Sequence, residues 1–378
     1  MSEPSEAAKA LRFILKDVVA ESLSFSGGGL RLVGIPHNMP APYLVKIVLE
    51  RFVGADFAMR PFEKTAWVTA VGFRGSLLVV SFEKFGLRVR ARATAGEESA
   101  LVQAFADVLQ RAIPQAERAI EPEIHSLIRE GRITIPNQFH LFRDRYDYLR
   151  GLAIANFSSD PPPPVKRSTA HGEVTTSDPF KPEREGFFAG SAALDAYFSW
   201  LEHALILLLP FSGFDARRDD LESLITDSWA EKFKRVFNLR SSSVAKIVYE
   251  QLRRVKREHR NPTTHGGFDR SLNLIHVQVP EVGAIPARLS KATSNRLSLH
   301  PLTDASFTEI CEQLDSADSF LRDGTHQLGF RFVSAGLDVY FNPESVSMYE
   351  RALADPANFT DFIDHIAWQQ DSARNMDW

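Results

Sequence analysis

The fold of the C-terminal half is decided by one apolar stretch, in which residues 194–210 read LDAYFSWLEHALILLLP. Its apolar side chains recur at spacings of three and four, at Leu194, Tyr197, Phe198, Leu201, Leu205 and Leu208. This spacing predicts an amphipathic helix that ends at Pro210, because proline cannot continue a helix. The longest apolar run, residues 204–211, is far shorter than the roughly 20 residues of a membrane span. We therefore expect a core helix of a soluble protein.

Three later segments repeat this helical spacing. A second helix is predicted by Leu221, Ile225, Trp229, Phe233 and Val236. The serines at 241–243 can cap a third helix, whose expected buried positions are Val244, Ile247, Val248, Leu252 and Val255. A fourth is predicted by Phe307, Ile310, Cys311, Leu314 and Leu321, and is closed by Gly324. Four such helices predict a bundle.

The N-terminal part has a different pattern. Residues 65–93 form three runs of strand-type residues separated by Arg74-Gly75 and Phe85-Gly86, which predicts an antiparallel meander. Helix-type spacing follows from 98 to 113 and again from 114 to 131. Further along the chain, residues 327–334 and 337–342 suggest a hairpin around Ala335-Gly336.

Four consecutive prolines at 161–164 interrupt the chain within a polar stretch, where they favour an extended conformation. We therefore expect an α+β protein with a mixed α/β sensor or regulatory domain at 1–156, a linker at 157–185, and a helical domain at 186–378. The helical domain would contain a small non-helical insert at 271–301.

Composition narrows the class of protein. The 378 residues are 44% hydrophobic and 24% charged, with a formal net charge of −4, which excludes a disordered chain. The lone Cys311 allows no internal disulfide and fits a reducing compartment. No basic region followed by an apolar stretch stands at the start, so we expect no secretory signal and a cytoplasmic location.

Positive charge is concentrated at residues 234–270, which contain ten Lys or Arg residues and three Asp or Glu residues. At helical spacing, Arg253, Lys256, Arg257 and Arg260 share one stripe. Such a field suggests a polyanionic ligand. The alternative is a solvated helix face.

At the end of the stripe, Arg260-Asn261-Pro262 is followed by His265. Pro262 should end or kink the helix there, which could bring Arg260 and His265 to one pocket. An arginine binds phosphate bidentately, and a histidine can exchange a proton near neutral pH. The alternative is a helix terminus that His265 merely caps.

Arg260, Asn261 and His265 resemble the signature of HEPN domains: an arginine, a polar residue such as asparagine, and a histidine four to six residues after the arginine. The resemblance covers roughly residues 190–324. It implies a metal-independent endoribonuclease without a cofactor, in which two copies of the motif form one site across a homodimer. The tyrosine that follows the histidine in the branch silenced by adenylylation is missing, since Gly266, Gly267 and Phe268 stand there.

By this resemblance, Arg260 would hold the scissile phosphate of an RNA substrate, His265 would act as acid or base, and Asn261 would orient the pocket. Arg253, Lys256 and Arg257 would position phosphates. The implied role is a toxin or antiviral defence effector, whose N-terminal domain binds an antitoxin or trigger protein. The alternative is a non-catalytic HEPN-fold module for dimerisation and for RNA or protein binding.

Other candidate sites have less support. Arg88, Arg90 and Arg92 share one sheet face, which could bind RNA or an acidic partner or could simply be solvated. No spacing typical of a metal site is present, and no nucleophile elbow of a serine hydrolase. On its apolar helix face, Cys311 is expected to be a buried thiol.

Overall fold

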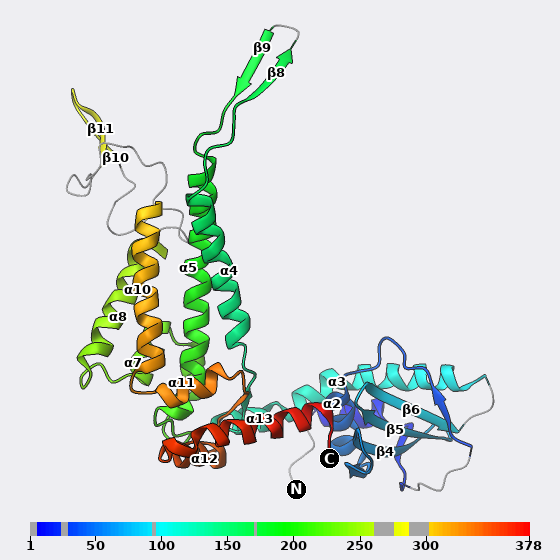
Figure 1. The fold of residues 1–378 in the computed structure, drawn as a ribbon. Coiled ribbons are helices and arrows are strands. Elements are labelled where there is room, and N and C mark those ends of the chain that lie inside the picture. Colours follow the sequence, from blue (N-terminus) through cyan, green and yellow to red (C-terminus); the bar gives the residue numbers. More distant parts are fainter. Residues whose placement is uncertain (1–5, 24–28, 93–95, 170–171, 261–275, 287–301) are drawn as a thin grey trace. The chain divides into compact units, whose positions relative to one another are not determined.

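The computed structural model describes residues 6–23, 29–92, 96–169, 172–260, 276–286 and 302–378. The chain is mixed α+β and 59% helical, with an antiparallel sheet in its N-terminal part and helices in its C-terminal part, as the sequence predicted. Two compact units divide it (Figure 1): unit 1 comprises Met1–Ile128 and Asp364–Trp378, and unit 2 comprises Arg129–Ile363.

Unit 1 contains an antiparallel sheet with the strand order β1-β4-β5-β6-β2, in which β3 also pairs with β4. Its strands are β1 (Val18–Ala20), β2 (Arg31–Val33), β3 (Phe57–Met59), β4 (Thr65–Phe73), β5 (Ser76–Glu83) and β6 (Gly86–Arg92). Arg74 and Gly75 both have positive φ, as the two-residue turn of a hairpin often requires. The predicted meander is thereby confirmed.

One hydrophobic core joins this sheet to the helical segments α1 (Glu6–Ile14), α2 (Pro42–Ile47), η1 (Val48–Val53) and α3 (Glu98–Arg129). The two stretches of helical spacing form the single helix α3, with Pro114 and Pro122 inside it. An interior proline costs about 3 kcal/mol. Burial of the α3 face that includes Phe105 and Leu109 against the sheet offsets this cost, because each such side chain contributes about 1.5–3 kcal/mol.

The C-terminal residues of the chain belong to unit 1. The indole of Trp378 donates a hydrogen bond to the carbonyl of Thr65 at 3.2 Å, and Lys64 pairs with Asp377. These contacts hold the chain end at the start of β4. The C-terminal domain expected over 186–378 therefore does not include its last residues.

Unit 2 begins before the boundary that the sequence suggested. Helix α4 (Phe139–Phe157) packs along α5 (Lys181–Leu208), and Figure 1 shows the two as neighbours. The boundary expected after residue 156 instead lies at Ile128, because the apolar side of α4 is buried on α5. Residues 157–185 are thus no linker between domains. Residue 157 ends α4 and residues 181–185 begin α5, and the residues between them connect the two helices and contain the exposed hairpin of β8 (Val165–Thr169) and β9 (Gly172–Thr176).

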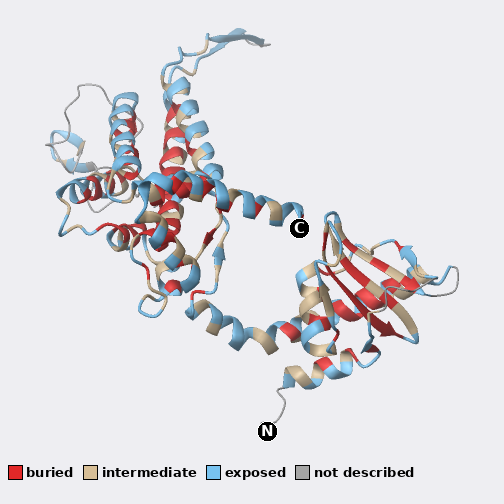
Figure 2. Ribbon diagram, turned by 60° about the horizontal axis from the view of Figure 1, so that its bottom comes forward, coloured by how far each residue is buried: buried red, intermediate tan, exposed pale blue. Residues whose placement is uncertain are grey.

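Helix α5 is the central element of unit 2, and Figure 2 shows it buried over much of its length. It is followed by the short 3-10 segment η2 (Leu209–Phe211), which includes Pro210. The prediction from residues 194–210 is confirmed. Among the described residues, the segment Lys181–Phe211 is also the one helix long and apolar enough to cross a membrane. In the most apolar 18-residue window of this segment, 72% is buried inside the protein, as in a core helix.

The prediction of one continuous second helix over residues 221–236 is wrong. The segment forms two helices, α6 (Leu221–Thr226) and α7 (Trp229–Val236). Asp227 is extended, and the side chain of Ser228 accepts a hydrogen bond from the amide of Glu231, which starts a new helix. The fourth predicted helix is confirmed as α10 (Asp304–Asp323), with Gly324 at its C-cap.

The hairpin expected within residues 327–342 is wrong. Residues Gln327–Ser334 form helix α11, which buries Phe330 and Val333 at a spacing of three. The strand β12 (Val339–Tyr340) pairs instead with β7 (Thr134–Ile135), far away in the sequence. The remaining elements are α12 (Pro343–Leu353), η5 (Pro356–Asn358) and α13 (Phe359–Asn375).

The predicted insert is described only over residues 276–286, where β10 (His276–Val279) pairs with β11 (Gly283–Pro286). The rest of the range 271–301 lies outside the described residues.

Candidate functional site around the end of helix α8

Helix α8 (Ser243–Val255) carries the basic stripe that the sequence singled out. Its predicted cap is confirmed, since the Ser242 side chain accepts a hydrogen bond from the amide of Ala245 at 3.1 Å. Val248, Leu252 and Val255 are buried, as predicted. Val244 and Ile247 are 56% and 58% exposed, which contradicts the prediction, because the neighbouring helices cover only one side of α8.

The last turn before residue 261 is a π-helix, η3 (Lys256–Arg260), which follows α8 directly. A π-turn contains more residues than an α-turn, so the rotation per residue on which the predicted stripe rests does not hold here. The four basic side chains separate into two pairs. Lys256 and Arg260 contact α5, whereas Arg253 and Arg257 are exposed.

Lys256 is largely buried between helices. Its ammonium group lies 3.9 Å from Glu202 and over the rings of Phe198 and Trp229, at 5.2 and 5.7 Å from their centroids. Burial lowers the pKa of this lysine, while the carboxylate of Glu202 opposes that effect. Lys256 therefore packs against α5 and α7 and does not share a surface with Arg253 and Arg257.

Arg260 is the last described residue of the helix, and it is oriented by α5. Its Nε donates a hydrogen bond to Oδ1 of Asp195 at 2.7 Å. The Arg260 side chain is 28% exposed, so it is only partly withdrawn from solvent. A carboxylate that holds Nε fixes the plane of the guanidinium, which prearranges it for an anion.

Asn261 and His265, the other two predicted catalytic residues, lie outside the described residues. Of the predicted catalytic set, the structure places Arg260 alone.

Two acidic residues of the site were missed by the sequence analysis, Asp195 and Glu202. They lie seven residues apart on α5, so they share one face of it. Glu202 receives Lys232 as well as Lys256. A signal was present, because these are the only acidic residues between 186 and 210 in an otherwise apolar helix.

The exposed basic side of α8 forms a shallow cavity of about 510 Å³ that is lined by Lys246, Ile247, Glu250, Gln251, Arg253, Arg254 and Arg257. Arg253 pairs with Glu250 at 3.2 Å, and Arg257 with Glu258 at 2.9 Å. Both arginines remain more than half exposed, so these pairs are weak and can exchange for another anion.

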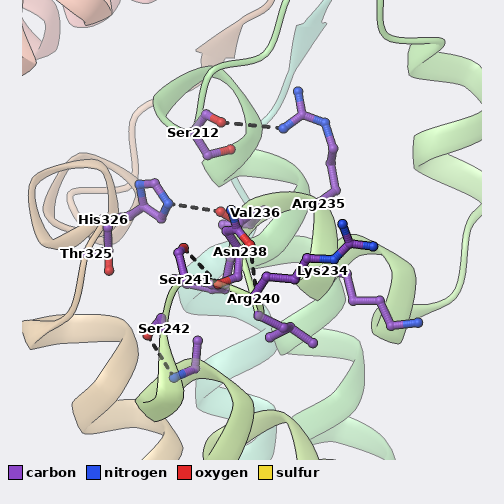
Figure 3. Close-up of a pocket in the computed structure, with 13 residues that line it drawn as sticks. Ser212, Lys234, Arg235, Val236, Asn238, Arg240, Ser241, Ser242, Thr325 and His326 are labelled. Carbon is purple, nitrogen blue, oxygen red and sulfur yellow. Dashed lines mark hydrogen bonds between the residues drawn. The ribbon is translucent and has the colours of Figure 1, made fainter.

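A larger cavity of about 820 Å³ lies at the opposite end of α8 (Figure 3), between the end of α7, the start of α8 and the residues that follow α10. Arg235 is bound there by Asp219 at 2.5 Å, and a ring nitrogen of His326 lies 2.9 Å from the carbonyl oxygen of Val236. The exposed guanidinium of Arg240 pairs with none of the described residues.

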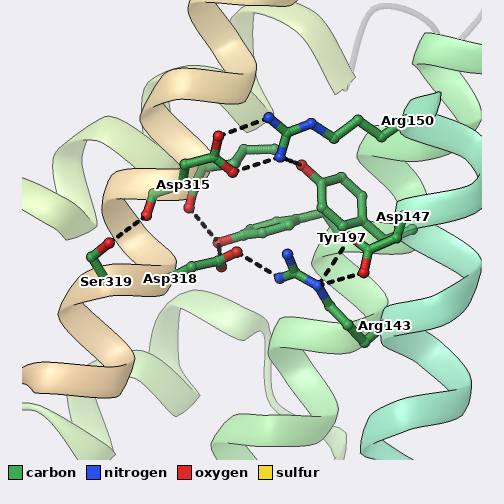
Figure 4. A network of polar contacts seen from close by, with 9 residues as sticks. Arg143, Asp147, Arg150, Tyr197, Asp315, Asp318 and Ser319 are labelled. Carbon is green, nitrogen blue, oxygen red and sulfur yellow. Dashed lines mark hydrogen bonds and ion pairs between the residues drawn. The ribbon is translucent and has the colours of Figure 1, made fainter. Parts of the chain in front are cut away.

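A polar network joins α4, α5 and α10 (Figure 4). Asp318 accepts hydrogen bonds from Arg143 at 2.5 Å and from the hydroxyl of Tyr197 at 2.9 Å. Burial raises the pKa of Asp318, although both donors oppose this. One turn along α10, Asp315 binds Arg150 through two hydrogen bonds of 2.5 and 2.7 Å.

The remaining predicted sites are also located. Arg90 bonds to Glu83 at 3.2 Å and Arg88 lies 3.9 Å from the same carboxylate, so Glu83 partly neutralises that sheet face. Cys311 is buried, as expected, and burial raises its pKa to about 11. Within the described ranges, no three His, Cys, Asp or Glu side chains are grouped so that they could hold a metal ion.

Comparisons of the chain with protein-family models, with curated proteins and with solved structures found no match.

Proposed function

We propose that the chain is a metal-independent endoribonuclease of HEPN type that acts in the cytoplasm as a toxin or antiviral effector. The observation that carries the proposal is the arrangement around Arg260. This residue ends the helical segment immediately before Asn261, and Asp195 holds its guanidinium through Nε. A partly exposed, oriented arginine that precedes the motif's asparagine and histidine in the sequence suits a phosphate-binding role.

The proposed reaction needs one cation and one group that exchanges protons. The ribose 2′-hydroxyl attacks the adjacent phosphorus and loses its proton to a base, while the 5′-oxygen leaves and gains a proton. The products are a 2′,3′-cyclic phosphate and a 5′-hydroxyl. We assign the phosphate contact to Arg260, the proton transfer to His265 and the orientation of the pocket to Asn261.

We assign phosphate positioning outside the reacting centre to Arg253 of α8 and Arg257 of η3, because both are exposed. Lys256 is assigned to packing instead, since its ammonium group lies over two aromatic rings and faces Glu202.

The proposed enzyme acts as a homodimer that brings two motifs together. The exposed apolar side chains Val244 and Ile247 on α8 support a protein contact on this helix. We further propose that unit 1 binds the trigger or antitoxin protein.

The test is cleavage of a mixed RNA substrate by the full-length protein in the presence of a chelator. We expect products with 2′,3′-cyclic phosphate ends from the wild type, and loss of cleavage in Arg260→Ala and in His265→Ala. Arg145→Ala, on the exposed side of α4, serves as the matched control and should keep full activity. A wild type that is inert on RNA, or variants that cleave like it, would contradict the proposal.

The exposed Val244 and Ile247 also favour the second candidate function, a non-catalytic HEPN-fold dimerisation module that binds RNA or protein. Such a module would dimerise and bind RNA without cleaving it. Sedimentation of Ile247→Asp separates the dimer question from the activity question, because a monomeric variant identifies the interface whether or not the wild type cleaves RNA.

A further inference from the structure

A third cavity, of about 520 Å³, lies inside unit 2 between the first turns of α4, the middle of α5, the end of α10 and α11. Its volume is in the range of small-molecule sites. It is lined by Phe139, Arg143, Trp200, Asp318, Arg322, Gln327, Leu328, Phe330, Arg331 and Ser334.

The apolar side of this cavity is aromatic. Phe139 packs edge-on against Trp200 and against Phe330, with ring centroids 5.3 and 5.6 Å apart. All three rings are buried, so they form a rigid wall rather than an exposed patch. Such a wall fits the face or edge of a planar ring.

The polar side carries more positive than negative charge. Asp318 is the acidic group of this wall, and Arg143 already pairs with it at 2.5 Å. Arg331 donates a hydrogen bond to the uncharged hydroxyl of Thr360 at 2.8 Å. Arg322, at the exposed end of α10, pairs with no described residue. Arg322 and Arg331 therefore line the cavity without a carboxylate partner among the described residues.

Trp200 adds an unsatisfied donor to the aromatic wall. The residue is 1% exposed, and its indole Nε1 is buried without a hydrogen-bond acceptor in the described part of the chain. A buried donor without an acceptor costs about 1–3 kcal/mol. A ligand that supplies an acceptor after a small adjustment of the ring would recover part of this cost.

We infer that this cavity binds a small organic anion with a planar ring, the chemistry that nucleoside monophosphates and aromatic carboxylates share. The ring packs against Phe139, Trp200 and Phe330, and the anionic group binds Arg322 and Arg331. The inference does not depend on the proposed nuclease, because Trp200 and Asp195 are five residues apart. They therefore point about 140° from each other around α5.

The test is calorimetric titration of the full-length protein with three kinds of probe: the four nucleoside monophosphates, indole-3-acetate, and inorganic phosphate. We expect a nucleoside monophosphate or indole-3-acetate to bind with a micromolar dissociation constant. Inorganic phosphate should bind at least tenfold more weakly, because it lacks the ring. Equal binding of phosphate, or no binding of any organic probe, would overturn the inference.

Two variants locate the site. Arg322→Gln removes an exposed charge and should weaken binding about tenfold without affecting the fold. Trp200→Phe keeps the aromatic wall but loses the N–H donor, and should weaken binding several-fold. Arg145→Gln, which changes an exposed arginine of α4 outside the cavity, is the control and should bind like the wild type. Unchanged binding in Arg322→Gln would place the ligand elsewhere and refute the assignment.

Discussion

Replacing Arg143 by methionine tests whether the polar network of α4, α5 and α10 stabilises unit 2. The burial of Asp318, which Arg143 contacts, suggests that it does. The substitution keeps an unbranched apolar side chain but removes the charge that faces Asp318. Arg150→Met is a matched control, because Arg150 lies two turns further along α4, is equally exposed, and pairs with an aspartate of the same helix, α10.

The two aspartates differ in burial, and this difference sets the expected magnitudes. The Asp318 side chain is 8% exposed and that of Asp315 is 49% exposed. Removing the partner of a buried charge costs about 3–5 kcal/mol, whereas an exposed pair contributes about 0–1 kcal/mol. Arg143 also lies 5.0 Å from the ring centroids of Tyr146 and Trp200, whereas Arg150 lies 5.9 Å from that of Tyr146, so the additional ring of Trp200 adds about 0.5–1 kcal/mol for Arg143. We expect Arg143→Met to cost about 3 kcal/mol more than Arg150→Met.

The assay is urea denaturation followed by circular dichroism at several pH values. Burial already raises the pKa of Asp318 above the ordinary value of 3.8, and loss of Arg143 raises it further. In this variant the folded state binds the extra proton, so its stability falls as the pH rises from about 3.8 through the folded pKa. The deficit should therefore be large at neutral pH and small in acid.

The double variant Arg143→Met with Asp318→Leu should regain stability at neutral pH, because it leaves no unpaired buried charge. Equal losses in Arg143→Met and Arg150→Met, or an Arg143→Met deficit that does not change with pH, would refute this reasoning.

Three further predictions concern single side chains. Ser242→Ala should destabilise the protein by about 1 kcal/mol through loss of the α8 cap, measured by urea denaturation, and an unchanged midpoint would contradict the capping role. If α8 binds RNA, Arg253→Gln and Arg257→Gln should each weaken binding and lower the slope of log affinity against log salt by about 1, which fluorescence anisotropy measures. His203 accepts a hydrogen bond from the amide of Gln138, and burial lowers its pKa to about 4. The stability that the neutral imidazole contributes should be complete above pH 6.5 and be lost as the pH falls through about 4, and an NMR titration midpoint near 6.5 would show the imidazole to be solvated.

Local signals in the sequence determined the elements whose formation depends on their own residues. The spacing of Leu194, Leu201 and Leu208 with Pro210 after them predicted α5, because burial of one helical face needs only that periodicity. The turn at Arg74-Gly75 predicted two strands of the meander, and the serines before residue 244 predicted the start of α8. Each of these signals acts within a few residues, so a single sequence carries it.

The tertiary structure alone decided which neighbours these elements meet. Periodicity indicated that Val244 and Ile247 belong to an apolar side of α8, but no helix of the described chain covers them. Likewise, charge spacing predicted that Lys256 and Arg253 share one face. In the structure, the π-turn and the carboxylates of α5 orient Lys256 and Arg260 towards α5 instead.

The same holds for contacts between distant segments. Asp318 accepts a hydrogen bond from Arg143, 175 residues away, and Ile135 pairs with Val339. The Arg143–Asp318 pair forms because the packing of α4, α5 and α10 removes both charges from water, so that each charge stabilises the other. Periodicity along one segment carries no information about which remote segment will cover it. The sequence by itself therefore determined α5, α8, α10 and the meander of β4, β5 and β6, and packing decided the orientation of Arg260 and the buried network behind it.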